Sequence, residues 1–173
     1  MNLDQLLENL RHQDDFMSCV SHWQVLPEQR AQVSPWPAEA DQRIKDVLAK
    51  RGIHQLYSHQ VSSLEAVQQG QDIVVVTPTA SGKTMCYNLP VLSSILKDPD
   101  TRALYLFPTK ALSADQVSEL YELIELLGVD IKTYTYDGDT PVAARKSIRQ
   151  AGHVVVTNPD MLHSNILPHH TKW

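Results

Sequence analysis

The residue types best suited to chemistry gather in one short loop, which joins a strongly apolar segment to an amphipathic one. The loop reads Thr77-Pro78-Thr79-Ala80-Ser81-Gly82-Lys83-Thr84. Between a strand and a helix, successive main-chain N–H groups can wrap an anion, and the positive end of the helix dipole strengthens the attraction. Gly82 permits a close backbone approach, Lys83 supplies a mobile positive charge, and the Thr84 hydroxyl can coordinate Mg²⁺. We therefore predict phosphate binding by Thr79, Ala80, Ser81, Gly82, Lys83 and Thr84, with Lys83 and Thr84 as the catalytic pair.

The loop departs from the strict phosphate-loop pattern at two positions. Thr77 stands where that pattern has its first glycine, and Ala80 stands where many such loops have another. The alternative is a chance Ser-Gly-Lys-Thr turn at the start of a helix. The intact Gly-Lys-Thr core between a predicted strand and a predicted helix favours phosphate binding.

The elements that must position this loop follow from the apolar pattern. Residues 72–77 form a continuous β-branched run, which is typical of a strand buried on both faces. Helices are predicted over residues 38–51 and 58–70 before this strand, and over 83–97, 109–127 and 141–150 after it. They alternate with strands over 103–107, 130–136 and 154–157, and a short helix starts near Pro159. Such alternation predicts an α/β fold, with a parallel sheet flanked by helices on both faces. Pro90 should kink or split its helix.

Composition limits the classes of function. The chain has 173 residues, a net charge of −5 and two cysteines. Bulk charge therefore does not predict nucleic-acid binding, so any such binding must come from local geometry. No apolar stretch approaches the roughly 20 residues that a membrane helix needs. With no signal-peptide pattern, we expect a cytoplasmic protein without a membrane partner. Residues 1–37 are predicted to form a helix and an arm, and residues 38–173 a domain.

Residues upstream of the loop extend the pattern. Leu56-Tyr57-Ser58-His59-Gln60 precedes it, and with the loop it resembles a superfamily 2 helicase of the DEAD/DEAH-box type. The resemblance covers residues 38–173 and implies the front part of a RecA-like P-loop NTPase domain that binds ATP with Mg²⁺. It makes the upstream segment a Q motif, in which Gln60 reads the adenine edge and Tyr57 stacks on the base. The alternative is that Gln60 is an ordinary exposed residue in the first turn of its helix.

Three downstream segments resemble nucleic-acid motifs of the same family. Pro108, Thr109 and Lys110 open a segment similar to motif Ia, and Gly138 lies in one similar to the glycine motif. A third segment is similar to motif Ib and contains Thr157, Asn158 and Asp160. Each follows a predicted parallel strand, so all three should meet at one edge of the sheet, where helix N-termini can bind nucleic-acid phosphates.

A narrower resemblance favours DNA over RNA. Cys86-Tyr87-Asn88-Leu89-Pro90 and Asn158-Pro159-Asp160-Met161-Leu162-His163, together with the loop, look like the YprA/MrfA-like helicases. That family implies an ATP-dependent DNA helicase tied to DNA repair. Its cysteine zinc cluster has no counterpart in this sequence.

Parts of the family pattern do not occur in the chain. There is no Asp-Glu pair, and hence no Asp-Glu-x-His motif to hold Mg²⁺ and orient water. The second RecA-like domain, with its arginine finger, is also missing. We expect negligible hydrolysis by this chain alone and an incomplete sheet, in which the strand before the loop exposes an unpaired edge. The alternatives are a P-loop ATPase or kinase that does not act on nucleic acid, and a non-catalytic binding module.

Overall fold

The computed structural model describes residues 2–27 and 30–173. The chain divides into two compact units, Met1–Ala31 and Gln32–Trp173. Residues 1, 28 and 29 of the predicted arm lie outside the described residues, and the predicted division at residues 37 and 38 stays a prediction. Among the described residues, no helix combines the length and apolarity that crossing a membrane requires.

The first unit is built on two short helices, α1 (Leu3–Arg11) and α2 (Asp14–Ser18). Asn2 caps α1, because its side chain accepts a hydrogen bond from the Gln5 N–H at 2.9 Å and the Gln5 side chain accepts one from the Asn2 N–H at 3.2 Å. The Arg11 guanidinium lies 4.7 Å from the centre of the Trp23 ring. Helix α2 lies in the segment that the sequence predicted as an arm, so part of that segment is helical.

The second unit contains a sheet of three parallel strands, β3 (Ala103–Leu106), β4 (Thr133–Thr135) and β5 (Val154–Thr157). The strand order is β3-β5-β4, and Val155 pairs with Leu104 on one side and Tyr134 on the other. The predicted strands at 103–107 and 154–157 are confirmed almost to the residue. The strand predicted over 130–136 is shorter than expected, since only its centre pairs with β5.

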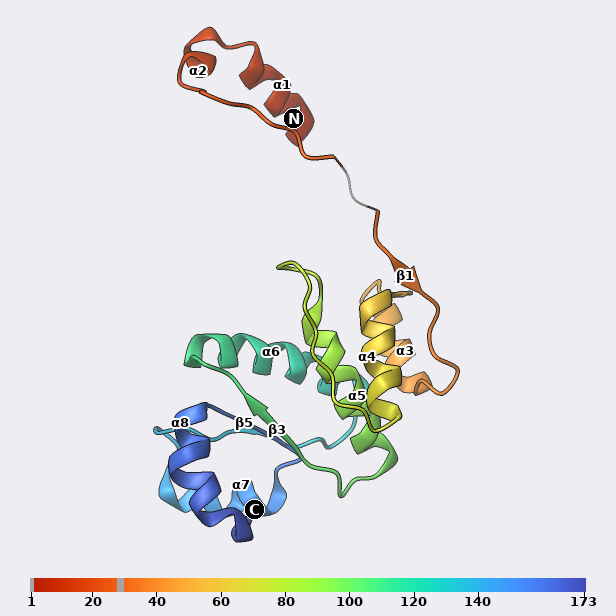
Figure 1. Ribbon diagram of the computed structural model, residues 1–173, viewed down its shortest axis with the longest axis vertical. Coiled ribbons are helices and arrows are strands. Elements are labelled where there is room, and N and C mark those ends of the chain that lie inside the picture. Colours follow the sequence, from red (N-terminus) through yellow and green to blue (C-terminus); the bar gives the residue numbers. More distant parts are fainter. Residues whose placement is uncertain (1, 28–29) are drawn as a thin grey trace. The chain divides into compact units, whose positions relative to one another are not determined.

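Helices cover both faces of this sheet, as predicted (Figure 1). Val154 and Val156 pack into the same apolar cluster as buried side chains of α5 (Lys83–Lys97) and α6 (Lys110–Leu127). Val155 instead joins a second cluster with side chains of α7 (Val142–Ala151) and α8 (Pro159–Met161). Successive side chains of a strand point to opposite faces, so the central strand is buried on both.

The remaining elements lie before the loop and after α8. Strands β1 (Val33–Ser34) and β2 (Leu56–Tyr57) form a small antiparallel pair. Helix α3 (Gln42–Lys50) is capped by Asp41, which explains why it begins later than predicted, and α4 (Ser58–Gln68) packs on α5. A π-helix (Leu162–Ile166) and a 3-10 helix (Leu167–Lys172) follow α8. Helix α5 continues through Pro90 without splitting, held by the buried side chains of Leu89, Leu92 and Ile95.

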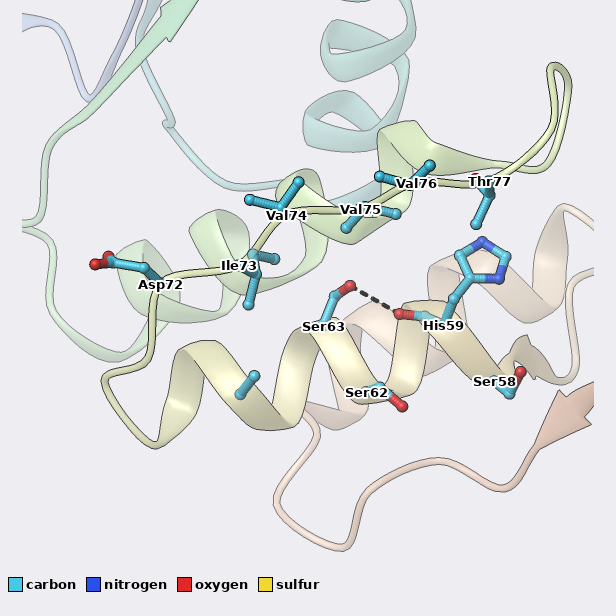
Figure 2. Close-up of a pocket in the computed structure, with 11 residues that line it drawn as sticks. Ser58, His59, Ser62, Ser63, Asp72, Ile73, Val74, Val75, Val76 and Thr77 are labelled. Carbon is cyan, nitrogen blue, oxygen red and sulfur yellow. Dashed lines mark hydrogen bonds between the residues drawn. The ribbon is translucent and has the colours of Figure 1, made fainter.

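The prediction of a buried strand over residues 72–77 is wrong for this structure. The segment is extended, but it pairs with no strand among the described residues. Val74 and Val76 are 91 % and 88 % exposed. Figure 2 shows Ile73 and Val75 pointing toward α4 while Val74 and Val76 point away, which is the alternation of a strand. The apolar pattern therefore encodes a strand conformation, and the partner strands that would bury it are what the described chain lacks.

Candidate nucleotide site and nucleic-acid interface

The predicted phosphate loop turns sharply into the N-terminus of α5. Gly82 is the N-cap of this helix and has φ +73°, in the left-handed region. Ala80 also has a positive φ, +58°, which residues with a Cβ rarely adopt. Two left-handed positions within three residues curl the backbone before the helix begins. The position occupied by Ala80 requires a conformation that glycine adopts freely, which accounts for the glycine that many phosphate loops have there.

The Lys83 ammonium group folds back over the concave side of this loop. Its Nζ donates to the Thr77 carbonyl oxygen at 2.8 Å and to the Pro78 carbonyl oxygen at 2.6 Å. The Thr77 and Ser81 hydroxyls, 2.6 Å apart, brace the two ends of the turn. The loop therefore holds a cation at the position where the sequence predicts a phosphate-binding lysine.

The Thr84 hydroxyl, predicted to coordinate Mg²⁺, lies in the first turn of α5. It donates to Oε1 of Gln116 on α6 at 2.9 Å, and the Tyr87 hydroxyl donates to the same oxygen. Burial raises the pKa of Tyr87, so its phenol stays protonated and remains a donor. Since a hydroxyl has one hydrogen and two lone pairs, Thr84 keeps oxygen lone pairs for a metal while donating to Gln116.

The upstream motif contacts the loop directly. Gln60 is only 5 % exposed, so the alternative that it is an ordinary surface residue is wrong. Its Nε2 donates to the Gly82 carbonyl oxygen at 2.9 Å, and its Oε1 accepts from the Tyr57 N–H at 2.9 Å. A Cβ on Gly82 would lie 2.6 Å from that Nε2, so a side chain there would force the Gln60 amide to move. One donor and one acceptor position of the Gln60 amide remain for a ligand.

Aromatic side chains lie beside this contact. The Tyr57 and His59 rings stack with centroids 5.6 Å apart and planes 11° apart, and His59 Nε2 lies 3.0 Å from the Ser81 carbonyl oxygen. Tyr57 is 40 % exposed, so part of its ring surface is open to a ligand. A cavity of about 180 Å³ borders both rings, and it is also lined by Gln32, Ser58, Thr77, Pro78 and Ser81.

A larger cavity, of about 540 Å³, lies between α4 and the unpaired segment 72–77 (Figure 2). Ser58, His59, Ser62 and Ser63 line its helical side. Of residues 77–84, only Thr77 lines this cavity.

The donor set at the loop fits a Mg²⁺-bound polyphosphate. It combines a flexible ammonium group, a helix N-terminus and a hydroxyl oxygen, which are the groups that phosphate loops use. The close approach of Gln60 to Gly82, which a Cβ would block, shows that the loop and the upstream motif form one cradle. Among the residues predicted to bind nucleotide, hydrogen bonds link Tyr57 and Gly82 through Gln60. Lys83 and Thr84 follow Gly82 directly, in the first turn of α5.

The predicted nucleic-acid residues meet at the carboxyl ends of the three parallel strands. A narrow cleft there is lined by side chains from all three predicted segments: Phe107, Thr109, Lys110, Ser113, Thr135, Asp137, Val156, Thr157 and Asn158. Thr109 caps α6 by accepting from the Leu112 N–H at 3.3 Å, and Asn158 caps α8 by accepting from the Met161 N–H at 2.9 Å. Two helix N-termini thus open at the same edge.

Lys110 is tied to carboxylates at this edge. It donates to Asp139, and its Nζ lies 3.7 Å from an Asp137 oxygen. The hydrogen bond to Asp139 raises the pKa of Lys110 above its ordinary value. A nucleic-acid phosphate that binds Lys110 must compete with these two carboxylates.

The other predicted residues of this interface differ in accessibility. Pro108, Gly138 and Asp160 are exposed near the cleft. Thr157 is 3 % exposed, and its hydroxyl donates to the Tyr136 carbonyl oxygen at 2.6 Å. Its side chain therefore joins β5 to the end of β4 and positions Asn158, and the Asn158 side chain lies closer to the surface.

Two polar residues at the site have no role in the sequence-based prediction. Gln116 and Tyr87 meet at the Thr84 hydroxyl, although Gln116 lies 32 positions along the chain from Thr84. Helix periodicity offered a partial signal, since Thr84 and Tyr87 are three residues apart and share a face of α5. The position of Gln116 depends on how α5 packs near α6, which the sequence pattern does not specify.

Comparison with known proteins adds an independent line of evidence. The sequence model of the DEAD/DEAH box helicase family matches residues 57–173. An uncharacterized ATP-dependent helicase, YprA from Bacillus subtilis, is 56 % identical over 172 residues, which are 99 % of this chain and 22 % of that protein. The ATP-dependent helicase hrq1 of Schizosaccharomyces pombe is 37 % identical over 75 % of this chain and 12 % of its own length.

Solved structures agree with these relatives. The crystal structure of the DUF1998 helicase MrfA bound to DNA and AMPPNP matches all of this chain and 24 % of that one, with a TM-score of 0.87 and 56 % identity. A DEAD-box helicase, Mss116, shares the fold at 17 % identity, with a TM-score of 0.61 over 77 % of this chain. These similarities confirm the predicted RecA-like fold. The chain spans about a quarter or less of the YprA, hrq1 and MrfA chains.

Proposed function

Because the chain belongs to the DEAD/DEAH box helicase family, we propose that it is the ATP-binding, DNA-contacting part of a longer ATP-dependent helicase motor. The observation that carries this proposal is the cradle in which Lys83 lies inside the loop and Gln60 joins the loop to Tyr57. Two relatives support the proposal: YprA is described as an ATP-dependent helicase, and the helicase MrfA was crystallised with DNA and AMPPNP.

Each residue of the nucleotide site has a task in this proposal. Lys83 exchanges the Thr77 and Pro78 carbonyl oxygens for phosphate oxygens. The main-chain N–H groups of residues 79–84 hold the same anion, and Thr84 offers its hydroxyl oxygen to Mg²⁺. Gln60 uses its remaining donor and acceptor positions on the adenine edge, while Tyr57 stacks on the base. When bound, Mg²⁺ supplies the positive charge that offsets the developing charge on the phosphates.

The second interface binds the strand in this proposal. Thr109 and Asn158 place the N-termini of α6 and α8 against two backbone phosphates, and Lys110 leaves Asp139 for one of them. Contacts to phosphates fix position on a strand and carry no sequence information. We therefore propose binding that depends little on DNA sequence. Action in DNA repair and a cytoplasmic location belong to the same proposal.

Hydrolysis requires groups that the described chain does not contain. No Asp-Glu pair and no second motor domain occur in it. An arginine finger alone contributes about 10³–10⁵ in rate, because phosphoryl transfer depends on positioning and charge stabilisation. We propose that the acidic motif and the second domain lie in the rest of the motor.

The test compares ATP hydrolysis by this chain with hydrolysis by the longer natural protein, each with and without single-stranded DNA. We expect negligible turnover by the chain alone, DNA-stimulated turnover by the longer protein, and loss of that turnover in Lys83→Ala. Hydrolysis that DNA does not change would instead indicate a P-loop ATPase or kinase that acts without nucleic acid. Nucleotide binding without turnover in the longer protein would indicate a non-catalytic module.

A further inference from the structure

The Thr84 hydroxyl is held from a helix that does not belong to the phosphate loop. It donates at 2.9 Å to Oε1 of Gln116, seven residues after the cap of α6. A free hydroxyl rotates, and its single hydrogen can point in several directions. Once that hydrogen is directed at Gln116, the lone pairs of the Thr84 oxygen are left in fixed directions away from α6.

A second donor fixes Gln116 itself. The Tyr87 hydroxyl donates to the same Oε1, so this carbonyl oxygen accepts two hydrogen bonds and has no lone pair left for another donor. Thr84, Tyr87 and Gln116 are all at least partly buried, which limits competition from water.

We propose that Gln116 is a positioning residue, which orients the Thr84 hydroxyl for a divalent cation and makes that orientation depend on α6. The inference rests on the proposed function, because Thr84 is a metal ligand only if the loop binds a Mg²⁺-nucleotide. Groups that orient a metal ligand typically change metal affinity by about 10–100-fold when they are removed. Helix α6 is continuous from Lys110 to Leu127, so its first turn, at the nucleic-acid edge, and Gln116 belong to one rigid element.

The closing experiment measures the affinity of the longer natural protein for a fluorescent ATP analogue, with Mg²⁺ and with a chelator. The ratio of the two affinities reports the contribution of the metal without any need for turnover. Gln116→Met keeps the length of the side chain and removes the strong acceptor. We expect it to lower this ratio about tenfold while the affinity in chelator stays unchanged. That unchanged affinity also shows that the cradle is folded.

Three matched variants separate positioning from general structure. Gln116→Glu keeps an acceptor for both hydroxyls and should retain the ratio. Tyr87→Phe removes the second donor and leaves the Thr84 hydrogen bond, so it should change the ratio less than Gln116→Met does. In a Thr84→Val background, Gln116→Met should have no further effect, because the hydroxyl on which it acts is gone.

The outcomes distinguish this inference from the proposed function. If the wild type binds the analogue and Lys83→Ala does not, the nucleotide site stands. The inference is then overturned if Gln116→Met leaves the metal ratio unchanged, or if it lowers the ratio equally in the Thr84→Val background. If Gln116→Met folds poorly, Gln116→Glu becomes the test. A lower ratio of the affinity with Mg²⁺ to the affinity with chelator in that variant also contradicts the inference. If the wild type shows no binding that depends on Lys83, the proposed function itself fails.

Discussion

Two residues of the phosphate loop adopt the same backbone conformation with different side chains. Gly82 has φ +73° and Ala80 has φ +58°, and both lie in the left-handed region. That region costs an L-residue with a Cβ roughly 1–2 kcal/mol, whereas glycine adopts it freely. Only at Gly82 does the space also matter, because a Cβ there would meet Gln60 Nε2 at 2.6 Å.

We predict that Gly82→Ala destabilises the protein and weakens nucleotide binding. The free energy of unfolding should fall by about 1–2 kcal/mol from backbone strain alone. Nucleotide affinity should fall as well, because the Gln60 amide must leave the Gly82 carbonyl oxygen. Denaturant unfolding and binding of a fluorescent nucleotide measure the two effects.

Ala80→Gly is the matched control for this substitution. It relieves existing strain and gains flexibility in the unfolded chain, so the two contributions, each about 1 kcal/mol, nearly cancel. Equal losses in Gly82→Ala and Ala80→Gly would contradict the assignment of a special role to Gly82.

Residue chemistry was predictable where a local pattern carries it. The order Gly82-Lys83-Thr84 was enough to place a cation inside the loop, and the structure finds Lys83 there. Burial of Gln60 was not predictable from its position in a helical first turn, since its partner, Gly82, lies 22 positions later in the chain. Gln116 was missed for the same reason. Long-range polar contacts depend on how the helices pack against one another, and the periodicity of the sequence does not predict that packing.

At the scale of elements, the strands of the parallel sheet and the longer helices of the second unit were predictable, because each has a strong periodic pattern and a clear end. Thr109 caps α6, and Gly128 ends it in a left-handed conformation with φ +64°. The junction between β4 and β5 depends instead on a histidine that carries no such signal. His153 Nδ1 accepts from the Lys132 N–H at 2.9 Å, and its carbonyl oxygen accepts from the Ala103 N–H at 2.8 Å.

We predict that this junction makes stability depend on pH. Burial lowers the pKa of His153 from 6.5, and the positive charges of Arg102 and Lys132 lower it further. The folded protein therefore binds fewer protons than the unfolded chain as pH falls through this range. The stabilisation by neutral His153 should be complete above pH 6.5 and should decrease as pH falls below it.

His153→Asn provides the comparison, since its side-chain oxygen can accept from the same N–H but does not titrate. The free energy of unfolding of the wild type, relative to this variant, should decrease as the pH falls from 6.5 to about 5.5. A difference that stays constant over this range would show that the imidazole of His153 titrates alike in the folded and unfolded chains.

At the scale of the whole molecule, the sheet is where prediction from sequence reached its limit. The pattern of residues 72–77 correctly indicates an extended conformation with alternating faces (Figure 2). Burial depends on partners, and among the described residues none pairs with this segment or with the outer edge of β3. Leu104 and Leu106 of β3 are likewise exposed, by 42 % and 44 %. Periodicity alone indicates that such segments are strands, and it does not specify which strands they pair with.

The central claim is that one loop binds a Mg²⁺-nucleotide through Lys83. Isothermal titration calorimetry of Mg·ATP into folded protein tests it most directly, with Lys83→Ala as the test variant and Lys110→Ala as the matched control at the other edge of the sheet. We predict saturable binding for the wild type and for Lys110→Ala, and none for Lys83→Ala at the same concentrations. Binding that survives in Lys83→Ala, or no binding by folded wild type, would contradict this account.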